Sequence, residues 1–176
     1  QIKTDHALAR LLWGTGNHDA RVLATMIADA KAMNEAELES WVAALDNYVL
    51  TDAVAKVAAA SAYAMKKMQQ WTRSTDEWTS SAGWIIMAAM ASDRGHADNF
   101  FDPYLTRIEK EIHGAPNRTR YAMNGAVIAI GCRGGAATTK AVTVAKRIGT
   151  VQVDHGETGC ETPEAASYIK KALDHQ

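Results

Sequence analysis

The chain has 176 residues, 47% of them hydrophobic, and its formal net charge is −1. This length favours one soluble domain that needs no disulfides or structural metal, and three prolines beside abundant alanine favour packed helices over a β-sandwich or barrel. Two cysteines, Cys132 and Cys160, cannot form a disulfide framework and indicate a reducing, cytoplasmic compartment. The apolar run of residues 83–91 is too short to span a bilayer, so we expect no membrane partner.

Apolar residues recur at helical spacing along nearly the whole chain and predict about ten helices of roughly three turns each. Several boundaries carry helix-start signals: Asn17 as an N-cap, Asn34 with Glu37 as a capping box, and Thr162 as an N-cap with Pro163 in the first turn. The expected apolar stripes lie within residues 8–12, 22–27, 38–45, 49–57, 64–71, 78–89, 101–112, 123–130, 141–148 and 165–173.

The connections between these helices are short, and residues 150–153, which alternate in polarity without an evident partner strand, predict an extended loop. Helices of similar length joined by short turns fit an α-solenoid of antiparallel helix pairs, whose concave face would suit a large ligand. A compact helical bundle is the alternative. We expect a single domain over residues 1–176.

Charge is distributed unevenly along the chain. Residues 1–102 carry nine Lys or Arg against thirteen Asp or Glu, residues 103–148 carry eight against two, and residues 149–176 carry two against five. A basic block of net charge +6 therefore lies between two acidic blocks. This block is either ordinary surface variation or a face for phosphates, and charge alone does not decide between the two.

One predicted helix carries a candidate reactive group. Asp52 falls among apolar residues, four positions after Tyr48, so the two side chains share a helix face. A carboxylate there could stabilise a developing cation or activate water, and the aromatic ring could hold a cation. The alternative is a solvent-exposed Asp beside a Tyr at a helix start, and the spacing alone favours this alternative.

Two other segments could contact phosphates. Arg118 and Arg120 lie in the first turn of a predicted helix, where guanidinium groups and free backbone N–H groups suit an anion; a solvated first turn is the alternative. Residues 79–81 carry hydroxyl groups at the start of another predicted helix, where they could donate to phosphates. Trp84 follows them and is the tryptophan least clearly assigned to the core, although core packing remains the alternative we favour.

The segment of residues 154–160 contains His155, Glu157 and Cys160. A metal site or a Cys–His nucleophile is conceivable there, but the spacing matches no common metal-binding pattern. A glycine-containing loop that satisfies its own backbone is the alternative we favour. We expect no metal and no cofactor.

Several motifs occur in an order and spacing that resemble the AlkD-like DNA alkylation repair proteins. The longest is LLWGTGNHDAR at residues 11–21, and the others lie at residues 41–42, 46–52, 71, 81–84, 118–124 and 153–165. This resemblance covers essentially the whole chain. It implies a HEAT-like repeat solenoid that holds duplex DNA on its concave face, and it implies that two or three helices of the family precede Gln1.

Active members of that family hydrolyse the N-glycosidic bond of cationic alkylated purines in duplex DNA. The resemblance implies that Asp52 is the catalytic carboxylate and that Tyr48 occupies a position where active members usually have Trp. A cationic base is already a good leaving group, and a carboxylate with aromatic rings can stabilise the cationic sugar, so the chemistry agrees with the residue types.

Two positions depart from the family pattern. Ser81 stands where active members carry Arg, and Gly125 stands where they carry a second cleft aromatic. Arg118 and Arg120 could replace the lost charge, so the implied DNA contacts are these two arginines with Ser81 and Trp84. The departures bear on catalysis more than on DNA binding.

Two principal hypotheses follow. The first is a glycosylase acting on alkylated purines in duplex DNA, and the second is a non-catalytic HEAT-like module that binds nucleic acid or protein. A third and weaker hypothesis is an unrelated enzyme that uses the loop of residues 154–160. A solenoid without its terminal helices exposes apolar surface, which would favour a dimer.

Overall fold

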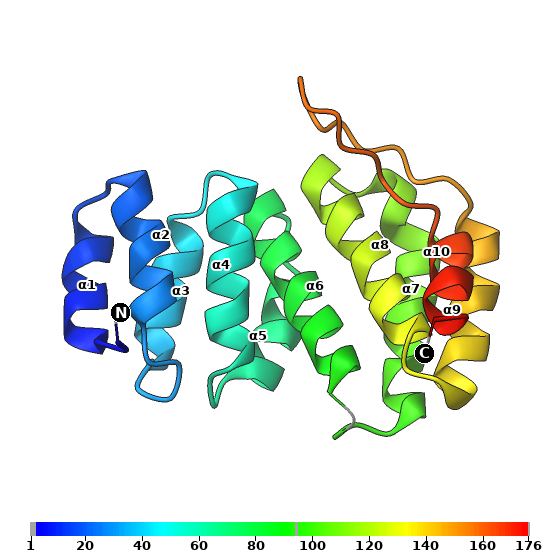
Figure 1. The fold of residues 1–176 in the computed structure, drawn as a ribbon, viewed down its shortest axis with the longest axis horizontal. Helices are drawn as coiled ribbons and strands as arrows, with labels where there is room; N and C mark the ends of the chain where they lie inside the picture. Colours follow the sequence, from blue (N-terminus) through cyan, green and yellow to red (C-terminus); the bar gives the residue numbers. More distant parts are fainter. Residues whose placement is uncertain (1–2, 94, 176) are drawn as a thin grey trace. The chain divides into compact units, whose positions relative to one another are not determined.

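The computed structural model describes residues 3–93 and 95–175. Within these residues, ten α-helices and two short 3-10 helices follow one another without a strand, which confirms the all-α prediction (Figure 1). None of the described helices is both long and apolar enough to cross a bilayer. The chain divides into two compact units, Gln1–Ile86 and Met87–Gln176, and each is described by itself.

The first unit is a series of short helices packed in neighbouring pairs. α1 packs on α2, α2 packs on α4, and both α3 and α5 pack on α4. The predicted caps are confirmed: Asn17 accepts from the N–H of Ala20, and Asn34 forms a capping box with Glu37. The helices are α1 (His6–Gly14), α2 (His18–Ile27), α3 (Glu35–Ala43), α4 (Tyr48–Ala59), α5 (Ala64–Trp71) and α6 (Glu77–Ser92), which continues past the unit boundary.

Two tryptophans from the sequence motifs connect α1 with α3. The rings of Trp13 and Trp41 stack with their centroids 4.2 Å apart and their planes 8° apart. The guanidinium carbon of Arg21 lies 5.2 Å from the centroid of the Trp13 ring. Both indoles are buried, so helix packing explains this part of the longest motif.

A buried ammonium group links α3 to α5. Lys67 is 1% exposed and donates from Nζ to Glu35 at 2.8 Å and to Glu39 at 2.5 Å. Burial by itself lowers the pKa of Lys67, but the two carboxylates outweigh it and raise that pKa above its usual value. Hydrogen bonds from Lys66 and Lys67 lower the pKa of Glu35.

The second unit begins with the end of α6. α9 packs against both α7 and α8, and α10 covers α8 and α9. Gly131 permits a close contact with α10, because a Cβ at this position would lie 2.3 Å from the Ile169 side chain. The elements are η1 (Asp98–Phe101), α7 (Asp102–Glu111), η2 (Ile112–Gly114), α8 (Asn117–Gly131), α9 (Gly135–Ile148) and α10 (Ala165–Leu173).

A single buried arginine fastens the segment before η1 to the turn between α8 and α9. Arg133 donates from Nη1 to the carbonyls of Ala91 and Asp93 at 2.5 and 2.6 Å, and from Nη2 to the carbonyl of His96 at 2.7 Å. Its guanidinium carbon lies 4.7 Å from the centroid of the Phe101 ring. A planar guanidinium directs several donors at once, which suits it to three carbonyl acceptors.

The start of α10 differs from the prediction. The helix begins at Ala165 with Glu164 as its N-cap, so Thr162 is not the cap and Pro163 precedes the helix. The Glu164 carboxylate accepts from two N–H groups of the first turn, and a full negative charge suits this end of the helix dipole better than a hydroxyl does. Hydrogen bonding to Ser167 is the main cause that lowers the pKa of Glu164.

Candidate functional site

The two side chains predicted for catalysis lie on the exposed side of α4. Asn47 caps this helix by accepting from the N–H of Leu50 at 3.0 Å, so the helix starts at Tyr48. Asp52 follows one turn later. The buried residues of α4 are Leu50, Thr51, Val54, Ala55, Val57 and Ala58. Packing of these residues leaves Asp52 exposed and Tyr48 50% exposed.

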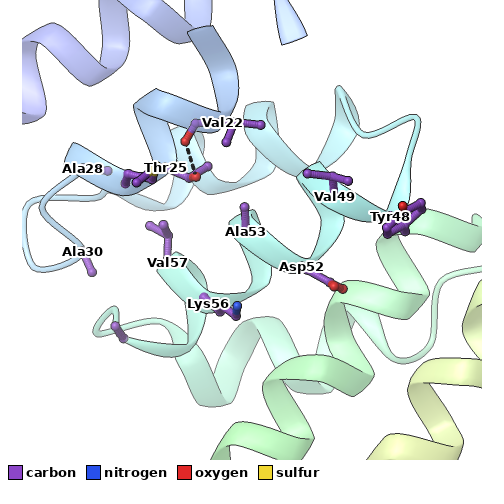
Figure 2. Close-up of a pocket in the computed structure, with 12 residues that line it drawn as sticks. Val22, Thr25, Ala28, Ala30, Tyr48, Val49, Asp52, Ala53, Lys56 and Val57 are labelled. Atoms are coloured by element: carbon purple, nitrogen blue, oxygen red, sulfur yellow. Dashed lines mark hydrogen bonds between the residues drawn. The ribbon is translucent and has the colours of Figure 1, made fainter. Parts of the chain in front are cut away.

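Tyr48 and Asp52 line one open groove of about 600 Å³ between α2 and α4 (Figure 2). The sequence prediction that they share a face is therefore confirmed, while their catalytic role stays a prediction. Asp52 points away from α2, and Lys56 lies one turn further along α4. Most of the groove wall is apolar and is formed by Val22, Met26, Val49, Ala53 and Val57.

The α2 side of this groove was not predicted from the sequence. Met26 belongs to the apolar stripe of residues 22–27, but its side chain is 76% exposed, because α2 buries Ala24 and Ile27 instead. The signal that could have found it is the width of the stripe. Residues 22, 23, 26 and 27 form two overlapping pairs at i, i+4, which is more apolar surface than one packed face of this short helix can bury.

Ser81 and Trp84 do not present their side chains at the surface. Ser81 is 2% exposed and donates its hydroxyl to the Glu77 carbonyl at 2.7 Å, and Trp84 is fully buried. Gly83 lies between them, and a Cβ there would meet the backbone nitrogen of Thr72 at 2.4 Å. Burial favours core packing for both residues, and a DNA contact by either stays an untested prediction.

The two predicted arginines lie together at the start of α8. This helix begins at Asn117 and has no side-chain hydrogen bond at its N-cap. The guanidinium carbon of Arg118 lies 4.7 Å from the centroid of the Tyr121 ring, and Arg120 is half-buried. Gly125 is exposed on the same helix, and no atom lies within 4 Å of the position that its Cβ would take. Gly125 therefore leaves open space at the surface of α8 that no side chain of its own fills.

A long connection between α9 and α10 is anchored beside these arginines. It contains no helix or strand, which confirms the extended loop predicted for residues 150–153, and it projects as two neighbouring limbs (Figure 1, orange). The amide of Asn117 donates to the carbonyl of Asp154 and accepts from its N–H, both at 2.7 Å. Asn124 Nδ2 donates to the carbonyl of Pro163 at 2.9 Å. These bonds hold both limbs to α8.

His155, Glu157 and Cys160 of this loop lie in different environments. The Nε2 atom of His155 lies 2.9 Å from the hydroxyl oxygen of Thr162, and its ring meets the Tyr121 ring edge-on with centroids 5.4 Å apart. Glu157 and Cys160 are exposed. Nowhere in the described chain are three or more His, Cys, Asp or Glu side chains grouped as metal ligands. His155 thus anchors the loop, and the structure offers no support for the third hypothesis.

Ser81 and Trp84 are buried, and the other four predicted site residues form two sets. Tyr48 and Asp52 share the groove of the first unit, and Arg118 and Arg120 share the first turn of α8 in the second unit. The groove can stabilise a positive charge beside an aromatic ring, and the helix start can bind phosphate.

Comparison with known proteins gives one consistent result. The model of the DNA alkylation repair enzyme family matches residues 1–169. Two uncharacterised proteins, from Listeria innocua serovar 6a and Listeria monocytogenes serovar 1/2a, are similar to the chain at 30% and 29% identity. Each similarity covers 98% of this chain and 76% of the relative.

A solved structure agrees with these relatives. It is described as "a new family of proteins related to the HEAT-like repeat DNA glycosylases with affinity for branched DNA structures", and it matches with a TM-score of 0.90 and 32% identity. The match covers 99% of this chain and 76% of that chain. The HEAT-like α-solenoid fold and the AlkD-like resemblance are thereby confirmed. The chain belongs to the DNA alkylation repair enzyme family.

Proposed function

We propose that this protein binds DNA and binds branched DNA more tightly than linear duplex. The observation that carries this proposal is the likeness to the solved structure whose family has affinity for branched DNA, at 32% identity over 99% of the chain. Membership of a DNA repair family supports a DNA ligand. The likeness supports the branched form of that ligand.

The start of α8 supports a phosphate contact. Arg118 and Arg120 oppose the helix dipole at this end, and a phosphate that pairs with either guanidinium group would offset that cost. Stacking on Tyr121 restricts the Arg118 guanidinium before any ligand arrives. The loop of residues 149–164 carries four carboxylates and no Lys or Arg, so it adds no further cation. At the start of α8 and in the adjoining loop, the two arginines are therefore the proposed phosphate-binding groups.

The test compares a four-way junction with a linear duplex of the same arm sequences by fluorescence anisotropy over a series of salt concentrations. We expect tighter binding to the junction. We also expect Arg118→Gln and Arg120→Gln each to lower the slope of log affinity against log salt by about one. Arg73→Gln, which removes an exposed arginine from the first unit, is the matched control. Equal affinity for junction and duplex would contradict the proposal.

We propose base release from cationic alkylpurines as a second candidate function. The observation that favours it is the position of Asp52 beside Tyr48 at an open groove, in a chain of this family. In this reaction the N-glycosidic bond breaks and its electron pair leaves with the purine, which becomes neutral. Water adds to C1′ of the sugar and loses a proton. The Asp52 carboxylate stabilises the cationic sugar between these two events, and Tyr48 contributes the face of its ring.

The second candidate ranks below DNA binding because two groups that the family resemblance implies are absent. Ser81 is buried and hydrogen-bonded within α6, and Gly125 has no side chain. Measuring free N7-methylguanine and N3-methyladenine released from alkylated duplex DNA by the parent and by Asp52→Asn tests it. Release that depends on Asp52 would establish base excision. Junction binding without release would leave a binding module. A dimer and a cytoplasmic location stay predictions that neither proposal requires.

A further inference from the structure

The groove between α2 and α4 exposes more apolar surface than a carboxylate site requires. Met26 is 76% exposed and Val49 is 39% exposed, and both line the groove. The hydroxyl of Thr25, which also lines it, donates to the Val22 carbonyl at 2.7 Å and so adds no free donor to the wall (Figure 2). A contiguous exposed apolar surface of this kind marks a binding site for a ligand with apolar faces.

The groove is large enough to hold a flat ring system. A volume of about 600 Å³ lies within the range of small-molecule sites. The thioether of Met26 can contact an aromatic ring favourably, and the half-exposed ring of Tyr48 lies at one end of the groove. A nucleobase has two apolar faces and stacks on such surfaces without regard to its identity.

One cation lies beside this apolar wall. Lys56 is exposed and lines the groove on the α4 side, one helical turn after Asp52. An ammonium group at the rim of an apolar slot is complementary to a base that carries a phosphate. It gives no advantage to an apolar peptide. The Asp52 carboxylate also lines the groove, so a phosphate is complementary at the Lys56 end and not beside Asp52. Family membership favours a nucleotide of DNA as the occupant.

We propose that the α2–α4 groove receives one unpaired nucleotide at a DNA branch point, with the base against the wall that includes Met26 and Val49 and the phosphate on Lys56. This inference rests on the proposed binding of branched DNA. A base in a continuous duplex must first be unpaired and unstacked to reach such a groove. A base that is already unpaired at a branch enters the groove at a smaller free-energy cost. The groove thus gives branched DNA a contact that linear duplex lacks.

Three junctions with identical arms test the inference. One is fully paired, one carries a single unpaired adenine at the branch, and one carries an abasic nucleotide in place of that adenine. We expect the parent chain to bind the adenine junction about tenfold more tightly than the abasic junction, because stacking of one base is worth roughly that factor. The abasic junction retains the phosphate, so this ratio isolates the base.

Two opposite changes in the groove should both abolish the ratio. Met26→Ala removes part of the wall, and Ala53→Leu adds apolar surface but fills the space. If the groove is a defined slot, both bring the adenine-to-abasic ratio close to one, whereas simple surface hydrophobicity would make Ala53→Leu bind more tightly. Leu11→Ala removes another exposed apolar side chain of the same unit and should leave the ratio unchanged.

The phosphate contact has its own test. Lys56→Gln should weaken binding to the adenine and abasic junctions by the same factor, about threefold to tenfold, and leave the fully paired junction unaffected. Lys170→Gln, an exposed lysine of α10, is the matched control.

Two results would overturn the inference. A parent ratio of one, with junctions still preferred over duplex, removes the nucleotide slot and leaves the proposed function intact; a groove that holds a peptide would give this result. Tighter binding by Ala53→Leu, or loss of the ratio in Leu11→Ala, would reduce the effect to general surface hydrophobicity. Absence of any preference for junctions would instead overturn the proposed function itself.

Discussion

Among the described residues, each compact unit buries one Lys or Arg side chain, and the two side chains are held mainly by different kinds of partner. Lys67 in the first unit pairs with the carboxylates of Glu35 and Glu39. Arg133 in the second unit donates to main-chain carbonyls of residues 91, 93 and 96 and forms a longer ion pair with Asp98 at 3.7 Å. Carboxylates titrate and carbonyls do not. The first clamp, made by Lys67, therefore depends strongly on pH, whereas the second, made by Arg133 and held mainly by carbonyls, depends on it less.

Both clamps hold helices that carry the proposed ligand contacts without touching those contacts. Lys67 links α3 to α5, and both of these helices pack on α4, which bears Asp52. Arg133 lies just beyond the end of α8, and Arg118 lies at the start of that helix. Loss of a clamp should therefore reduce stability in a way that can be separated from ligand binding.

Arg133→Met should give the largest loss of stability. The substitution leaves three carbonyl groups without their donor in a partly or fully buried environment, and we expect the free energy of unfolding to fall by about 3 kcal/mol. Urea titration followed by circular dichroism measures this change. Arg133→Lys retains the charge but cannot direct donors at three acceptors, so it should lose a large part of the same energy. A loss below about 1 kcal/mol for Arg133→Met would contradict the clamp.

Lys67→Met should cost less, about 1–2 kcal/mol, although this side chain is the more buried of the two. Its carboxylate partners are 37% and 50% exposed at their side chains, so water solvates them after the lysine is removed. The methionine also regains apolar packing. The same urea titration at neutral pH measures the difference, and a loss equal to that of Arg133→Met would show that partner exposure does not decide the cost.

The pH dependence separates the two clamps further. The pKa of Glu35 is lowered, so its contribution is present above the ordinary value of 4.5 and is lost as pH falls below it. The pKa of Lys67 is raised, so its contribution is complete below the ordinary value of 10.5 and is lost as pH rises above it. The stability difference between the parent and Lys67→Met should shrink at both extremes. The difference for Arg133→Met should change less with pH, because its main partners are carbonyls and its carboxylate partner Asp98 lies 3.7 Å away.

Local signals in the sequence predicted the helices well. The caps at Asn17 and Asn34 depend on neighbours three residues away, and the common face of Tyr48 and Asp52 depends on one helical turn. The family motifs added the order in which the helices assemble. These features need no knowledge of distant contacts.

Features that depend on residues far apart in the chain could not be predicted. Lys67 meets partners about thirty positions away, and Arg133 meets carbonyls about forty positions away. The burial of Trp84 and the exposure of Met26 likewise depend on which side of each helix its neighbours cover. Periodicity shows that a helix has an apolar side, but it does not show which part of a wide apolar stripe stays open to bind a ligand.

Gly125→Ala should stabilise the second unit by about 0.5–1 kcal/mol. The residue lies in the middle of α8, is exposed, and has open space where a Cβ would be, so alanine gains helix propensity without a clash. Gly83→Ala in the middle of α6 is the matched contrast. Its Cβ would meet the backbone of residues 71 and 72, and it should destabilise the chain by about 1–3 kcal/mol. Thermal unfolding of the two variants measures both signs.

Asp52→Asn and Tyr48→Phe should have the smallest effect on stability, within about 0.5 kcal/mol of the parent. Asp52 is exposed and Tyr48 is half-exposed, and the cap that starts α4 belongs to Asn47 rather than to either of them. Urea titration measures the change, with Leu50→Ala on the buried side of the same helix as a control that should lose several times more. If both variants keep the parent stability, any loss of base release or junction binding they cause reports on the ligand and not on folding. A large loss of stability in Asp52→Asn would instead assign this carboxylate a structural role and remove the main support for base release.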